Sequence, residues 1–239
     1  AIYAYVQQYE VPSRSPGTRA RRTRRGFIAL GRLEDYSAGV VFRHEQTLAA
    51  PKADRLELLR HTRAQTGQLF LLYSDPTRTI DAILEDVSRT PPATDLRDGY
   101  GVTHRLWPIS DPATIQRIVA VMADKQLVIA DGHHRYETAL AWRNECRARA
   151  GRLDLDAPYE KAMMTLINAQ GEGLTILPTH RVVANVPGFD LASFQRKLAR
   201  AFDWYAYPFV SAAERESSLA DFRKDLAARG RERRAIGAY

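Results

Sequence analysis

One short segment constrains the fold of this chain more than any other. An apolar run from Leu127 to Ala130 leads through Asp131-Gly132 directly into a helical pattern that continues to Ala150 and ends at Gly151. An apolar strand followed at once by a glycine turn and a helix predicts a strand–loop–helix unit of an α/β protein. The free backbone N–H groups at such a helix start, together with the helix dipole, form a site for an anion.

The side chains of this loop strengthen that interpretation. Gly132 lets a ligand approach the backbone closely. His133, His134 and Arg135 add hydrogen-bond donors, and Arg135 can hold a phosphate through two parallel bonds. Asp131 can hold Mg²⁺ or a substrate amine. The alternative is a helix capped by Asp131 with solvated histidines, but packing gives no reason for four polar side chains at this place.

Several familiar sites are absent from the sequence. It contains no Walker loop, no G-x-G-x-x-G and no G-x-S-x-G motif. Adjacent histidines do not supply the converging ligands that zinc requires, and Cys146 lies about three helical turns further on. Spacing along the chain therefore does not favour a zinc site.

Strands and helices interleave along the chain, which predicts an α/β (α+β) fold with a mixed sheet. Residues 2–11 and 24–33 flank a turn rich in Pro, Ser and Gly, which predicts a β-hairpin with a long loop. We expect three segments: the hairpin at 1–35, a phosphate-loop core at 36–150 and an α/β segment at 151–239 packed on the core.

The last segment carries its own signals. Alternating hydrophobicity predicts strands at 174–177, 182–186 and 204–210. Ser211 with Glu214 predicts a capping box that opens a final amphipathic helix. The chain starts and stops in strand-like patterns, so we expect a segment cut from a longer protein.

The chain is basic, with a formal net charge of +7, and arginines cluster in the second hairpin strand. An anionic partner, either nucleic acid or a phosphorylated small molecule, and a solvated arginine-rich surface both explain this charge. Aromatic residues make up 9% of the chain and do not alternate with the basic runs, which disfavours a surface for single strands. A single cysteine and the lack of a long apolar stretch indicate a cytoplasmic protein without a disulfide or membrane span.

Other polar clusters supply further candidates. Glu45, which follows Arg43-His44, is either a general base or a surface carboxylate that balances Arg43. Lys52 lies in the first turn of a predicted helix and is either a phosphate ligand or a solvated lysine. The turn Thr179-His180-Arg181 either completes a phosphate pocket or is a plain polar loop.

Five motifs together resemble one bacterial family, the domain of unknown function numbered 1015. They are Arg24-Arg25-Gly26-Phe27, His44-Glu45 with Lys52-Ala53-Asp54-Arg55, Gly101-Val102 with His104-Arg105-Leu106-Trp107, the stretch from Ala130 to Ala139, and Leu177-Pro178-Thr179-His180-Arg181. The loop also resembles that of the ParB/sulfiredoxin-like superfamily and of its free serine kinases, which implies a core of that fold with an added hairpin and C-terminal segment.

The resemblance to the kinases implies an activity. It makes Asp131, Gly132, His133, His134 and Arg135, with Thr138, a loop that binds the phosphate donor, with Asp131 as the Mg²⁺ ligand. It makes Glu45 the catalytic base, with His134 as a second catalytic residue, and the acceptor a small hydroxylated metabolite such as L-serine. The donor is a nucleotide or pyrophosphate. Two other hypotheses remain open: a ParB-like, nucleotide-switched DNA-binding module, and a non-catalytic partner that uses the arginine hairpin.

Overall fold

The computed structural model describes residues 1–12, 19–47, 49–176 and 181–238. They form two compact units, residues 1–177 and 178–239, and each is described here by itself. The first unit is a mixed sheet with flanking helices, so the predicted α/β class is confirmed. The predicted division into three segments stays a prediction, although strands from the first and third segments pair in this sheet.

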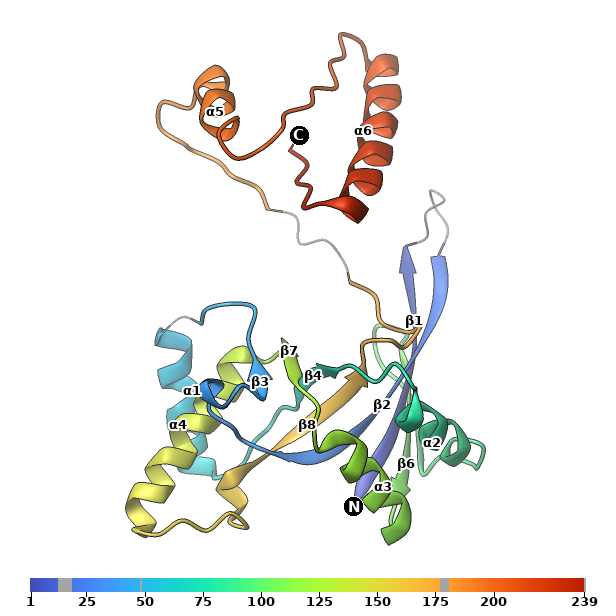
Figure 1. Ribbon diagram of the computed structural model, residues 1–239, viewed down its shortest axis with the longest axis vertical. Helices are drawn as coiled ribbons and strands as arrows, with labels where there is room; N and C mark the ends of the chain where they lie inside the picture. Colours follow the sequence, from blue (N-terminus) through green and yellow to red (C-terminus); the bar gives the residue numbers. More distant parts are fainter. Residues whose placement is uncertain (13–18, 48, 177–180, 239) are drawn as a thin grey trace. The chain divides into compact units, whose positions relative to one another are not determined.

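The sheet has eight strands in the order β3-β7-β4-β8-β2-β1-β6-β5 (Figure 1). Two pairs, β3 with β7 and β4 with β8, run parallel, and the others run antiparallel. The strands are β1 (Ile2–Pro12), β2 (Arg19–Arg32), β3 (Val41–Phe42), β4 (Leu69–Tyr73), β5 (Thr94–Arg97), β6 (Thr103–Ile109), β7 (Leu127–Asp131) and β8 (Lys161–Asn168).

Four helices accompany the sheet in the first unit: α1 (Ala49–Thr62), α2 (Thr79–Val87), α3 (Pro112–Met122) and α4 (His133–Ala150). Two short 3₁₀ turns, η1 (Tyr36–Ala38) and η2 (Pro158–Glu160), complete it. In Figure 1, α1 and α4 lie side by side near β3, β7 and β4, whereas α2 packs on β1 and β2. None of the described helices has the length and apolarity needed to cross a bilayer.

Periodicity explains how these elements pack. Ile2, Ala4 and Val6 alternate along β1 and are buried, as a half-buried strand requires. Ile80, Ile83 and Leu84 bring the apolar face of α2 into the same core. The predicted hairpin is confirmed as β1 and β2, which pair from Tyr3 opposite Ile28 to Pro12 opposite Arg19.

The second unit contains two described helices, α5 (Leu191–Leu198) and α6 (Ala212–Glu232). The predicted cap by Ser211 is confirmed, because the Glu214 N–H donates to Ser211 Oγ at 3.2 Å. The Glu214 carboxylate accepts from the Val210 N–H at 3.0 Å, one residue before the N-cap position that a capping box uses. The strands predicted at 182–186 and 204–210 are wrong, and the described part of 174–177 is not a strand either. Alternating residues form a strand only where a partner strand pairs with them, and none of the described residues does so here.

Candidate functional site

The predicted strand–loop–helix unit is present at the expected residues. β7 ends at Asp131, Gly132 has a φ of +99°, and α4 begins at His133. A Cβ on Gly132 would lie 3.0 Å from Arg135 Nε and 3.1 Å from Leu69 Cδ2. Glycine is therefore required here for both its backbone conformation and its small size.

The body of α4 is held firmly in the first unit. Tyr136 and Ala139 are buried in the core, and the Tyr136 hydroxyl donates to the Glu34 carbonyl at 2.7 Å. Arg143, also buried, donates to the Leu33 carbonyl at 2.6 Å and to Asp35 at 2.8 and 2.9 Å. These contacts fix the position of the loop that precedes the helix.

The parallel pairing of β3 with β7 decides what faces the loop. Val41 lies opposite Leu127 and Phe42 opposite Val128, so the residues after both strands emerge at the same edge of the sheet. As a result, Glu45 Oε1 lies 3.4 Å from Nδ1 of His133. The expected proximity of Glu45 to the loop is therefore observed, while its catalytic role stays a prediction.

His133 is the most enclosed polar residue of the loop, with 3% of its surface exposed. The His44 ring meets the His133 ring edge-on with centroids 4.5 Å apart, and the His44 backbone N–H lies 3.5 Å from Nε2 of His133. Burial lowers the pKa of His133, and the neighbouring His44 lowers it further, while the Glu45 carboxylate acts in the opposite direction. The neutral imidazole is therefore favoured.

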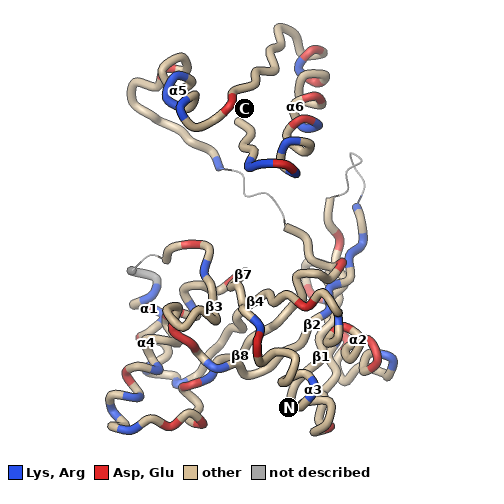
Figure 2. Tube along the Cα trace, in the orientation of Figure 1, with Lys and Arg blue, Asp and Glu red and all other residues tan. Residues whose placement is uncertain are grey.

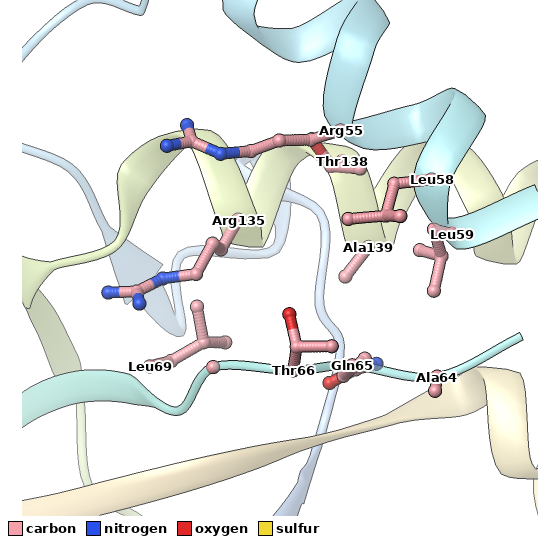
Figure 3. Close-up of a pocket in the computed structure, with 11 residues that line it drawn as sticks. Arg55, Leu58, Leu59, Ala64, Gln65, Thr66, Leu69, Arg135, Thr138 and Ala139 are labelled. Carbon is pink, nitrogen blue, oxygen red and sulfur yellow. The ribbon is translucent and has the colours of Figure 1, made fainter. Parts of the chain in front are cut away.

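A cavity of about 280 Å³ opens beside the loop, between α1, α4 and the segment that leads into β4. Figure 3 shows Arg55 and Arg135 extending toward one end of it, with Leu58 and Leu59 at the other. Its described lining also includes the hydroxyl-bearing Thr66 and Thr138 but no carboxylate. A cavity with two guanidinium groups at one end and leucines at the other suits an anion attached to an apolar body.

Arg135 is positioned by two glycines. A Cβ on Gly67 would lie 2.8 Å from Arg135 Nη1, so residue 67 has to be small for the arginine to lie here. Arg135 forms an ion pair with Asp131, whose side chain is 72% exposed. A phosphate placed beside Arg135 would have to compete with Asp131 for this guanidinium.

Lys52 pairs with a carboxylate of α4, and its role as a phosphate ligand stays a prediction. Its ammonium donates to Glu137 Oε2 at 2.8 Å, and Arg43 donates to Glu137 Oε1 at 3.1 Å. Thr47 also donates to this carboxylate. Burial by itself raises the pKa of Glu137, but the hydrogen bonds from Lys52 and Thr47 outweigh it and the pKa is lowered. Glu137 therefore pairs with two cations, Arg43 from the segment after β3 and Lys52 from α1. The sequence pattern did not reveal this role.

The remaining predicted residues are spread out. Thr138 is buried, and its hydroxyl donates to the His134 carbonyl at 2.7 Å within α4. Thr179 and His180 lie outside the described residues, and Arg181 is an exposed residue of the second unit. Arg55, which the sequence analysis did not single out as a ligand, lines the cavity instead.

The loop offers Mg²⁺ a single carboxylate, that of Asp131. Mg²⁺ typically takes one or two carboxylates and completes its shell with water and substrate phosphates. The exposed Asp131 therefore fits an ion that arrives with a phosphate donor. His44 and His133, as nitrogen donors, do not suit this hard cation.

These features define an α/β protein in which a short glycine loop joins a strand to the N-terminus of a helix. The chain belongs to the family described as "Protein of unknown function (DUF1015)", which it matches over residues 1–238. No match was found among curated proteins or among solved structures.

Proposed function

We propose that this protein is a phosphotransferase that moves a phosphoryl group from a small phosphate donor to the hydroxyl of a small metabolite, with L-serine as the first candidate. The observation that carries the proposal is the placement of Glu45 3.4 Å from His133, at the start of the helix whose loop provides the anion site. A phosphoryl acceptor needs a base near its hydroxyl, and the donor needs cations and N–H groups around its phosphates.

The donor site in this proposal consists of the α4 N-terminus, Arg135 and Arg55. The described cavity lining holds two guanidinium groups and no carboxylate, so a phosphate there meets Arg55 and competes with Asp131, outside that lining, for Arg135. Mg²⁺, when bound with the donor, neutralises phosphate charge, and Asp131 is the residue proposed to hold it. The ParB/sulfiredoxin-like ancestry and a cytoplasmic location belong to the same proposal.

The arrangement gives Glu45 and Arg135 separate tasks. Glu45, with an exposed side chain, accepts the proton of the acceptor hydroxyl. Arg135 exchanges its bond to Asp131 for bonds to the transferred phosphate, where negative charge is concentrated. The firm anchoring of α4 keeps the backbone that carries Arg135 in place during the transfer.

The DNA-binding alternative has less support. A helix-turn-helix joins two helices by a turn of three or four residues, and no two successive helices of the described part of the chain are joined in this way. Figure 2 shows basic residues along strand β2. Arg24 of this strand donates to Gln7 at 3.0 Å and lies over the Tyr9 and Phe70 rings. Part of this basic cluster is therefore structural.

The test is an assay for O-phosphoserine. Protein, Mg²⁺ and L-serine are incubated with ATP, ADP, CTP or pyrophosphate, and the products are followed by phosphorus NMR. We expect O-phosphoserine with one donor, and its loss in the isosteric Glu45→Gln variant.

The matched control is Glu10→Gln, which removes an exposed carboxylate on β1 away from the loop. Formation of O-phosphoserine at the same rate in Glu45→Gln contradicts the assignment of the base. A complete lack of turnover and of donor binding refutes the proposed function. Release of phosphate without a phosphorylated product supports a nucleotide-switched module instead.

A further inference from the structure

We propose that His44, Glu45 and His133 bind a divalent first-row transition metal ion, such as Zn²⁺. This proposal goes beyond phosphoryl transfer, and the observations that carry it hold whether or not the protein transfers phosphate. One donor atom from each of the three side chains lies within 4.8 Å of the others. They belong to two segments that are remote in sequence, which is why spacing along the chain did not reveal them.

The donor set selects the class of ion. Two imidazoles with one carboxylate, and further positions open, are typical of catalytic zinc sites and of non-haem iron sites. Zn²⁺ binds imidazole nitrogen and carboxylate oxygen at about 2.0–2.2 Å, so donors within 4.8 Å of one another close on an ion after small side-chain rotations. Mg²⁺ and Ca²⁺ prefer oxygen ligands and fit this set less well.

The contacts of His133 give a second, independent indication. Only 3% of the surface of His133 is exposed. Its polar contacts with the described residues are nevertheless long, 3.4 Å to Glu45 and 3.5 Å to the His44 N–H. Strong hydrogen bonds of this type measure about 2.7–3.2 Å. A buried ring with only long contacts has room for a stronger partner, and a metal ion supplies one.

The surrounding charges leave Glu45 available. Two cations close to Glu45 in sequence, Arg43 and Lys52, both pair with Glu137. Among the described residues, the contact that Glu45 makes with another ionisable group is the one with the His133 imidazole. Both His44 and Glu45 are exposed, so an ion reaches the site from solvent and keeps open positions for water or a substrate.

The experiment is a direct titration of the untagged, metal-stripped chain with Co²⁺ and Zn²⁺. Co²⁺ reports its coordination through visible absorption bands, which does not depend on any enzymatic activity. We expect one equivalent of Co²⁺ to bind, Zn²⁺ to displace it, and excess Mg²⁺ to leave it in place. Absence of binding, or ready displacement by Mg²⁺, overturns the proposal.

Three variants locate the site. His44→Ala and Glu45→Gln alter exposed side chains and are expected to fold, and each is expected to weaken Co²⁺ binding at least by the roughly 10- to 100-fold seen when supporting residues of metal sites are lost. His133→Ala is the third, although its burial makes it the one that risks misfolding. The matched control, His61→Ala, removes an exposed histidine of α1 and should bind like the wild type. Unchanged affinity in His44→Ala and Glu45→Gln refutes the assignment.

A bound ion also affects the proposed transfer reaction. It occupies the carboxylate that the base needs, so Glu45 serves as a base only in the metal-free protein. Zn²⁺ is therefore expected to inhibit O-phosphoserine formation, and a chelator to restore it. If the protein transfers no phosphate at all, the Co²⁺ titration still decides the metal proposal.

Discussion

The two ends of helix α4 use polar side chains in opposite ways. In its C-terminal half, Arg147 makes two bonds of 2.6 Å to the fully buried Glu160, and Arg143 bonds to Asp35 and to the Leu33 carbonyl. At its N-terminal end, the polar contacts that His133 makes with the described residues are long, and Asp131, just before the helix, is mostly exposed. Short, complete pairing stabilises a fold, whereas polar groups that are held in place but incompletely paired are available to a ligand.

The largest effect on stability is expected from a substitution in the C-terminal half of α4, where the polar pairs stabilise the fold. Arg143→Ala leaves the buried Leu33 carbonyl and one side of Asp35 without a partner. We expect the free energy of unfolding to fall by about 3 kcal/mol, the lower part of the range for a broken buried pair, because Asp35 is half exposed. Urea denaturation measures this loss.

The control for that change lies on the same helix. Arg149 forms a surface pair with Glu145, and Arg149→Ala should cost less than about 1 kcal/mol. Equal losses in the two variants would mean that Arg143 contributes no more than a surface arginine.

The next largest effect is expected on activity, from a substitution at the N-terminal end of α4. Arg135→Gln removes a guanidinium that lines the cavity and that pairs, among the described residues, with the exposed Asp131. We expect stability to change by less than about 1 kcal/mol. In the phosphotransferase assay, kcat/KM should fall about 100-fold, as when one donor to a transition-state anion is lost. A large loss of stability with unchanged kcat/KM would contradict the proposed difference between the two ends of α4.

The two glycines that flank α4 sharpen the comparison. Gly132→Ala places a Cβ at a φ of +99° against Arg135 and Leu69, whereas Gly151→Ala meets only the strain of a φ of +63° in open space. We expect a loss of about 1 kcal/mol for Gly151→Ala and of about 2 kcal/mol for Gly132→Ala. Only Gly132→Ala should impair donor binding, because it displaces Arg135. Thermal unfolding measures the loss of stability in both variants, and titration with the phosphate donor measures binding.

The smallest expected effect is the pH dependence of stability that the Arg147–Glu160 pair of the C-terminal half of α4 contributes. Hydrogen bonds from Arg147 lower the pKa of Glu160, although its burial acts in the opposite direction. The stability from this pair is therefore present above the unfolded pKa of about 4.3 and is lost as pH falls through the lower folded value.

Urea unfolding of the wild type and of Glu160→Gln at several pH values tests this effect. The variant should be less stable at neutral pH and should lose less stability than the wild type on acidification. Parallel curves for the two proteins would show that Glu160 does not contribute to the pH dependence.

Local signals predicted much of the fold. The hairpin, the strand–loop–helix unit and the Ser211 cap each depend on residues close in sequence, whose hydrogen bonds and backbone angles form locally. The strand β3 has two residues and β5 has mostly exposed ones, so neither carries an apolar pattern. The strands expected at 182–186 and 204–210 did have the pattern but lack a partner strand among the described residues.

The sequence by itself determined that a glycine turn opens a helix with histidine and arginine at its start, because these residues are neighbours. Only the tertiary structure decided what faces them. The parallel pairing of β3 with β7 brings His44 and Glu45 to His133, and the packing of α1 on α4 brings Arg55 to the cavity of Arg135. Contacts between remote segments depend on the order and direction of strands, which no short stretch of sequence encodes.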